Sequence, residues 1–171
     1  TGAVTISNNI GTTTAAGVTG ALEIGNANTS TLTLAGTVYN ANAATYTAVA
    51  GGDNISLTNA TGVTFTSSDD AITFGTARIL LGNGSDLVVN STGGDISVVA
   101  ITGTSVEDVT LNAAAGNVTV GVIGAADGQI SDVVLTGTTI NLGGNITTDD
   151  GAGAGDVDIN GNVILTAAVT I

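Results

Sequence analysis

The stretch ISLTNATGVTFTSSDDAITFGTARILLGNGSDLVVNSTGGDISV, residues 55–98, decides the fold. It repeats a triplet in which two apolar residues flank a central residue, and an apolar residue at every second position predicts a strand with one buried face. The triplets begin at residues 55, 63, 72, 79, 87 and 96, at intervals of 8, 9, 7, 8 and 9, so any three successive intervals sum to 24. This constant sum predicts a coil of three short strands, each stacked in parallel on the strand one coil earlier.

The same pattern continues along the rest of the chain, and two longer self-matches support it. VEDVTLN at 106–112 recurs as ISDVVLT at 130–136, 24 residues later, and GDISVVAI at 94–101 recurs as GNVTVGVI at 116–123, 22 residues later. We therefore predict an all-β fold over residues 1–171 as one segment. The predicted fold is a right-handed parallel β-solenoid (β-helix) with about three short strands in each coil of roughly 22–24 residues.

Gly, Asn and Asp separate the triplets. They form runs such as Gly51–Gly52–Asp53–Asn54, Gly93–Gly94–Asp95 and Gly116–Asn117. These residue types tolerate a positive φ, so we expect tight corners between the faces of the coil. The chain contains no Pro, as expected where the neighbouring coil uses each backbone N–H.

Most catalytic groups are missing from the chain. It has no Cys, no His and no Lys, and Arg78 is its single basic residue. Disulfides, zinc sites, Ser/His/Asp triads and Cys or Lys nucleophiles are therefore excluded. We expect no enzyme and no catalytic, cofactor-binding or metal-ligating residue. For Arg78 we expect an ion pair with an aspartate of an adjacent coil, and Asp69, Asp70 and Asp86 are the nearest acids in the sequence.

The acidic charge restricts the partners. Fourteen acidic residues against one basic residue give a formal net charge of −13. Phosphate binding needs the opposite sign, so we expect no nucleic acid partner. No apolar run approaches the roughly 18–20 residues needed to cross a bilayer, so we expect no membrane insertion.

Calcium is the one cofactor that the acidic residues leave open. GNGSDLVV at 82–89 partly matches the nonapeptide of calcium-binding β-rolls, and Asp95 follows Asp86 by nine residues. The pairs Asp69–Asp70 and Asp149–Asp150 are either calcium ligands between neighbouring rods or solvated corners.

The segment GTVYNANAATYTAVAGG at 36–52 is less regular and contains both tyrosines. We predict a longer loop that projects from one corner. Tyr39 and Tyr46 fit either an interface patch for a partner or an adjacent coil, or a pair of rings that covers the side or end of a thin aliphatic core.

Two further surface patterns remain open. Thr31–Thr33, Thr45–Thr47 and Thr64–Thr66 are outward Thr-x-Thr pairs, which suit an ice-binding β-solenoid if they align on one face, although they do not recur at the 24-residue period. Seven Asn-x-Ser/Thr sequons are either glycan acceptors or chance products of an Asn- and Thr-rich chain. They stand at Asn28, Asn54, Asn59, Asn83, Asn90, Asn117 and Asn145.

EDVTLNAAAGNVTVGVIG at 107–124 and NITTDDGAGAGDVDINGNVILTAAVTI at 145–171 resemble filamentous-haemagglutinin-like, long β-strand-repeat bacterial surface exoproteins. This resemblance implies a non-catalytic segment of an extracellular fibre, filament or adhesin stalk at the bacterial cell surface. Both ends of the chain lie within the repeat pattern. We therefore expect partners that are copies of itself or adjoining repeats end to end, with other surface or matrix components.

Two other functions stay open as alternatives. The first is the ice-binding β-solenoid. The second is a carbohydrate-active β-helix enzyme, which needs acids clustered in a groove and a basic residue beside them.

Overall fold

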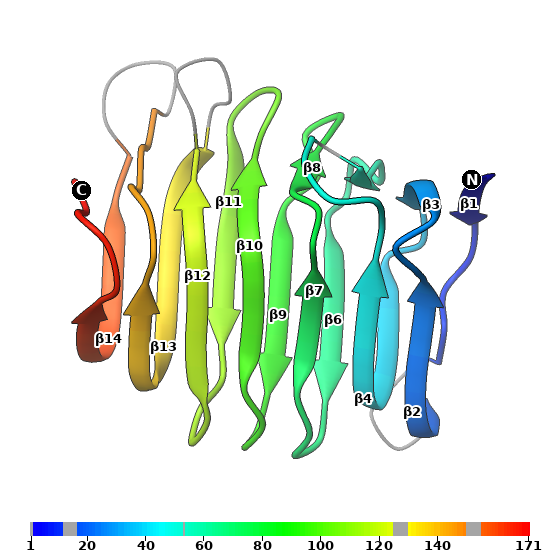
Figure 1. The fold of residues 1–171 in the computed structure, drawn as a ribbon, viewed down its shortest axis with the longest axis horizontal. Helices are drawn as coiled ribbons and strands as arrows, with labels where there is room; N and C mark the ends of the chain where they lie inside the picture. Colours follow the sequence, from blue (N-terminus) through cyan, green and yellow to red (C-terminus); the bar gives the residue numbers. More distant parts are fainter. Residues whose placement is uncertain (1, 12–16, 53, 125–129, 150–154) are drawn as a thin grey trace.

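The structure is a computed structural model, and it describes residues 2–11, 17–52, 54–124, 130–149 and 155–171. All elements in these ranges are β-strands, and they form one 14-stranded sheet in which neighbouring strands pair in parallel. In Figure 1 the chain rises along the front, crosses the top, descends at the back and advances from the N-terminus at the right to the C-terminus at the left. This path is a right-handed turn. The predicted right-handed parallel β-solenoid is confirmed.

The described ranges contain strands but no helix, so they include no helix long and apolar enough to cross a membrane.

The strands are short, as the triplets predict, except where one strand continues around a corner. They are β1 (Gly2–Ile6), β2 (Val18–Gly25), β3 (Thr29–Leu34), β4 (Val38–Thr47), β5 (Ile55–Leu57), β6 (Val63–Ser67), β7 (Ile72–Gly75), β8 (Ile79–Leu81), β9 (Leu87–Ser91), β10 (Ile96–Thr102), β11 (Glu107–Asn112), β12 (Asn117–Ile123), β13 (Ile130–Leu142) and β14 (Val157–Leu165).

Each coil has three faces, which the chain visits in a fixed order. Face 1 holds β1, β3, β5 and β8, face 2 holds β6, β9 and β11, and face 3 holds β2 and β7. The longer strands each cover two faces: β4, β13 and β14 run from face 2 to face 3, and β10 and β12 run from face 3 to face 1.

The predicted register is confirmed on all three faces. Rungs expected 24 residues apart are direct partners: Ile55 with Ile79, Val63 with Leu87, and Ile72 with Ile96. The two self-matches are also direct stacks. Val109 pairs with Val133 at a displacement of 24, and Ile96 pairs with Val118 at a displacement of 22.

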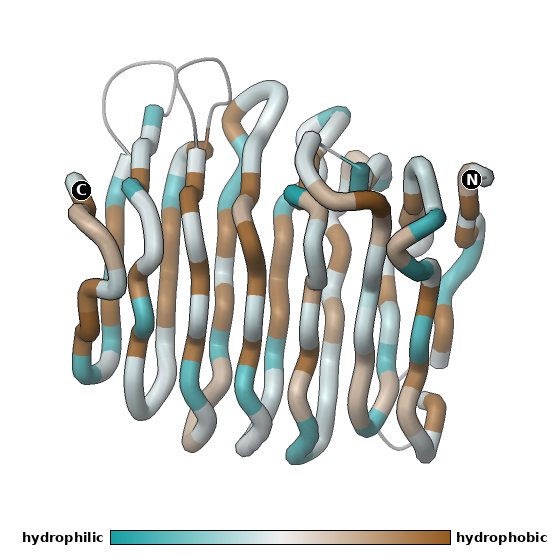
Figure 2. The backbone as a smooth tube through the Cα atoms, viewed as in Figure 1, coloured by the Kyte–Doolittle hydropathy of each residue, from teal (hydrophilic) through white to brown (hydrophobic). Residues whose placement is uncertain are grey.

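The core consists of three columns of apolar side chains, one behind each face. In Figure 2 the hydrophobic residues lie within the strands, and hydrophilic residues concentrate at the lower turns. The face 1 column contains Leu32, Ile55, Ile79, Ile101 and Ile123, all fully buried. The last described coil is less covered, because Val163, Ile164 and Leu165 of β14 are 47%, 51% and 57% exposed.

The aromatic residues correct two expectations. The segment 36–52 is not a projecting loop, because most of it forms β4. Tyr39 and Tyr46 are 1% and 0% exposed, so they are not a contact patch. They pack inside the coil with Phe65 and Phe74, at ring-centroid distances of 4.9 to 6.3 Å. The core is therefore aromatic over this stretch as well as aliphatic.

The corners use glycine for two different reasons. Gly51 and Gly52 have φ of 76° and 69°, as the sequence predicts for a tight corner. Gly94 and Gly116 do not have positive φ, so this part of the prediction is wrong. A Cβ on Gly94 would overlap the backbone of Asp70, and a Cβ on Gly116 would overlap the backbone of Gly94. Glycine is needed there because one coil lies directly on the backbone of the next.

Candidate functional site

The most regular polar feature is a column of four aspartates at the corner between face 1 and face 2. Asp86 Oδ1 accepts the backbone N–H of Asp108 at an N···O distance of 2.9 Å. Asp108 Oδ1 accepts the N–H of Asp132 at 3.2 Å, and Asp132 Oδ1 accepts the N–H of Asp156 at 2.9 Å. We call Asp86, Asp108, Asp132 and Asp156 the aspartate ladder. All four residues are exposed, so the ladder joins successive coils and places a line of negative charge along one edge.

Glu107 lies beside this ladder but is fully buried. Its carboxylate accepts the backbone N–H of Thr104 at 3.0 Å and that of Ser105 at 2.9 Å. It also accepts the hydroxyl groups of Thr104 and Ser105, at 3.0 and 2.8 Å. These four donors replace the water that a buried carboxylate loses, so Glu107 holds the turn before β11 in shape.

The two aspartates of the partial nonapeptide do not form a β-roll site. Asp86 belongs to the aspartate ladder, whereas Asp95 lies at the corner between face 2 and face 3. There Asp95 Oδ1 accepts the backbone N–H and the side-chain amide of Asn117, at 2.8 and 3.1 Å. Within the described part of the chain, no group of three or more acidic side chains is arranged to hold a metal ion.

The acidic pairs lie at exposed corners. Thr92 Oγ1 donates to Asp69 Oδ1 at 3.3 Å, and the backbone N–H of Asp70 donates to Ser67 Oγ at 3.0 Å. Asp149 is exposed, and its backbone N–H donates to a carbonyl of β13 at 2.7 Å. Asp150 lies outside the described residues.

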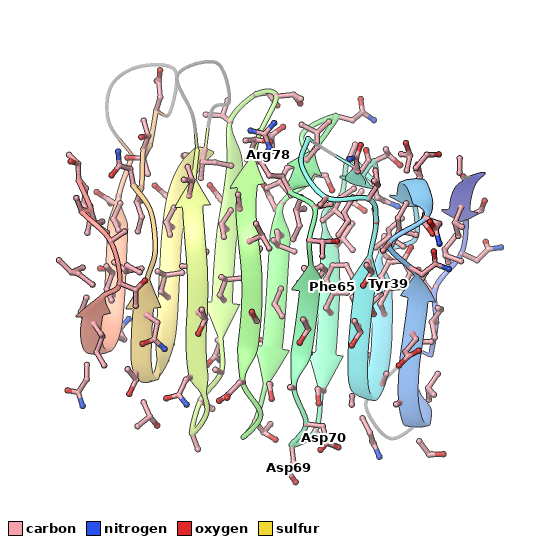
Figure 3. The ribbon with its side chains drawn as sticks, in the orientation of Figure 1. Tyr39, Phe65, Asp69, Asp70 and Arg78 are labelled. Atoms are coloured by element: carbon pink, nitrogen blue, oxygen red, sulfur yellow. The ribbon has the colours of Figure 1, made fainter. Side chains whose placement is uncertain are left out.

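Arg78 lies at the upper edge of the molecule, whereas Asp69 and Asp70 lie at the lower edge (Figure 3). Neither aspartate is therefore its ion-pair partner. The three residues do not form the arrangement of acids beside a cation that a carbohydrate-active site needs. An ion pair between Arg78 and another aspartate stays a prediction.

The three Thr-x-Thr pairs lie on three different faces. Thr31–Thr33 is on face 1, Thr64–Thr66 is on face 2 and Thr45–Thr47 is on face 3. None of them stacks on another such pair. Thr64–Thr66, for example, has Val88 and Asn90 as its partners in the next coil.

The sequons differ in how far their side chains are engaged. Asn54 and Asn59 donate to the carbonyls of Val49 and Ala35 at 3.0 and 2.9 Å. Asn117 and Asn145 also bond the adjacent coil. Asn28 and Asn83 are the exposed asparagines outside these contacts, apart from a 3.5 Å approach of Asn83 Nδ2 to Thr58 O.

The sequence reasoning missed both the aspartate ladder and Glu107. A signal for the ladder was present, because an Asp directly precedes four apolar triplets, at 86, 108, 132 and 156. A weaker signal for Glu107 was the pair Thr104–Ser105 just before it, since these residues offer hydroxyl and backbone donors to a following acid.

Comparisons of the chain with protein-family models, with curated proteins and with solved structures found no match. The class that the structure defines is therefore the parallel β-solenoid, and the argument for function rests on the chain itself.

Proposed function

We propose that the chain is a structural, non-catalytic segment of an extracellular bacterial surface fibre, filament or adhesin stalk. The observation that carries this proposal is the continuity of the three buried columns from β3 to β13. Each coil of such a stack buries its apolar side chains only against its neighbours, so stability grows with length. A rod is the natural use of this construction.

The surface charge supports a location outside the cell. A net charge of −13 with a single basic residue keeps a long rod soluble and separates parallel rods by repulsion. The aspartate ladder concentrates part of this charge on one edge, away from the coil-to-coil surfaces.

The proposed partners are copies of the chain or adjoining repeats end to end, together with other surface or matrix components. The edge of β14 supports end-to-end contact. Val163 and Leu165 stack on the buried residues Ile140 and Leu142, yet they are 47% and 57% exposed. A sheet edge with apolar side chains of this kind can be continued by a further parallel strand.

The rod is favoured over the two alternatives by the distribution of polar groups. An ice-binding face needs its hydroxyl pairs aligned on one side of the coil, whereas the three Thr-x-Thr pairs here are divided among three faces. A carbohydrate-active enzyme needs acids gathered around a cation, whereas Arg78 lies at the opposite edge from Asp69 and Asp70.

Electron microscopy of the native material tests the proposal. We expect filaments whose reconstruction shows coils stacked at about 4.8 Å, with density that continues past both ends of the residues described here. Isolated particles in which both ends are covered by a cap would contradict the fibre, and the alternatives would then have to be reconsidered.

A matched pair of variants tests the edge itself. Leu165→Asp places a charge where the next coil would stack, whereas Ile164→Asp places it at the adjacent outward position, which is similarly exposed at 51%. We expect L165D to shorten or abolish filaments, because a buried unpaired charge is costly, while I164D filaments keep their length. Equal filament lengths for both variants would argue against an end-on contact through β14.

A further inference from the structure

The sequence contains two Asn-Gly pairs, Asn83–Gly84 and Asn160–Gly161. In an Asn-Gly pair the glycine has no Cβ, so its backbone nitrogen can approach the side-chain carbonyl carbon of the asparagine more easily than in other pairs. The two pairs are chemically alike. Any difference in their reactivity in the folded protein therefore comes from the structure around them.

Asn83–Gly84 forms the open corner between β8 and β9. Both residues are exposed, and their φ values are 67° and 72°, the geometry of a tight two-residue turn. No atom lies within 4 Å of the position that a Cβ on Gly84 would occupy. The side-chain amide of Asn83 has only the long contact of 3.5 Å with Thr58 O.

Asn160–Gly161 is held by contrast inside β14. Asn160 pairs with Thr136 of β13 in parallel register. A Cβ on Gly161 would overlap the carbonyl oxygen of Gly137, so the backbone of this pair lies directly on the neighbouring coil. Moving the Gly161 nitrogen toward the Asn160 side chain would require breaking the pairing of β14.

We propose that Asn83 is a site of spontaneous, non-enzymatic deamidation in the folded protein, and that Asn160 is protected. The backbone nitrogen of Gly84 loses its proton to water and forms a bond to Cγ of Asn83. The Cγ–Nδ2 bond breaks, and ammonia leaves with the proton that it needs, giving a cyclic imide. Water then opens the imide at either carbonyl, which yields aspartate or isoaspartate at position 83. No oxidant or reductant takes part.

The modification has a structural consequence at the start of the aspartate ladder. Isoaspartate adds one methylene to the backbone of the corner that leads directly into Ser85, which is fully buried, and Asp86. Asp86 then no longer lies in register to accept the N–H of Asp108. The modification therefore adds a negative charge and loosens one coil-to-coil contact together. This inference does not depend on the proposed rod function.

Peptide mapping of the aged full-length chain tests the proposal. The protein is incubated folded at mildly alkaline pH and, in parallel, unfolded in denaturant, and fragmentation that separates isoaspartate from aspartate locates the products. In the folded protein we expect conversion at position 83 to be at least about tenfold faster than at position 160. In denaturant the two rates should be similar. N83Q should lose the early product, and N160Q should retain it.

Two outcomes would overturn the proposal. One is the absence of product at position 83 in the folded chain while the unfolded chain reacts, which would mean that the corner is held as firmly as β14. The other is conversion at position 160 as fast as at position 83 in the folded chain. The consequence for the ladder is tested separately: the isoaspartate form should unfold at a lower denaturant concentration than N83D, which adds the charge alone.

Discussion

Two tyrosine hydroxyls in one aromatic cluster differ in their hydrogen bonding. The Tyr39 hydroxyl accepts the N–H of Gly36 at 2.9 Å and donates to the carbonyl of Ile6 at 3.3 Å. The Tyr46 hydroxyl is buried without a hydrogen-bond partner. We expect Tyr39→Phe to lower the free energy of unfolding by about 1 kcal/mol, and Tyr46→Phe to leave it unchanged or raise it. Denaturant unfolding measures both, and a larger loss for Y46F would contradict the assignment.

The same tyrosines make stability sensitive to alkaline pH. Burial raises the pKa of Tyr39 and of Tyr46 above the ordinary value near 10. A folded-state pKa above the unfolded value means that this contribution is complete below about pH 10 and is lost as the pH rises beyond it. The chain has no Lys and no Cys, so few other groups titrate there. We expect the unfolding free energy to fall above about pH 10, and to fall much less in the Y39F/Y46F variant.

Glu107 offers a test of a buried carboxylate, with the only other glutamate as its control. Glu107→Ala leaves the N–H groups of Thr104 and Ser105 buried without an acceptor, and we expect a loss of about 3 kcal/mol. Glu107→Gln keeps one oxygen acceptor and should lose less. Glu23 is exposed on face 3, so Glu23→Ala should change stability by less than about 0.5 kcal/mol. Similar losses for E107A and E23A would show that the turn does not need its acid.

At the residue scale the sequence predicted apolar side chains well and polar ones poorly. Ile55 and Leu57 were assigned to the core because their period is visible in a short window. Glu107 could not be assigned, because its donors belong to a turn whose shape is known only from the folded chain. The aromatic core was also missed, since rings from Tyr39 and Phe74 meet only after coils 24 or more residues apart are stacked.

At the level of the corner, Gly116 tests why glycine is required. Gly116→Ala would push a Cβ into the carbonyl oxygen of Gly94, and the neighbouring coil would have to move. We expect a loss of about 3 kcal/mol in unfolding free energy. Gly20 in β2 is the control, because nothing lies within 4 Å of a Cβ there and its φ is not positive. Gly20→Ala should be neutral or stabilising by about 0.5 kcal/mol, and an equal loss at both positions would refute the close-approach explanation.

The strands themselves were largely predictable, with β4 as the instructive exception. Ile72–Thr73–Phe74 is a strand both in pattern and in structure. VYNANAATYT, the sequence of β4, has two Asn and three Ala and weak strand propensity. It becomes a strand because Ala44 and Tyr46 stack on Ile72 and Phe74 of the next coil. Stacking between coils decided that element, and a single-sequence window does not contain it.

For the whole molecule, stability is expected to vary along the rod. The aromatic cluster lies in the coils of β4, β6 and β7, whereas β14 has a half-exposed apolar edge. In a linear stack each coil is held by its neighbours, so opening proceeds most easily from a weakly covered coil. We expect hydrogen exchange to be slowest in β6 to β10 and fastest in β14. Uniform protection along the chain would mean that the coils open only together.

The aspartate ladder gives the rod a chemical polarity. In every step the carboxylate belongs to the earlier coil and the N–H to the later one. The two ends of a stack built in this way are therefore unlike: one presents acceptors, and the other presents donors. A junction related by a two-fold axis would bring like groups together, carboxylate against carboxylate. Growth of such a rod is vectorial, and a fibre assembled from it has a front and a back that a binding partner can distinguish.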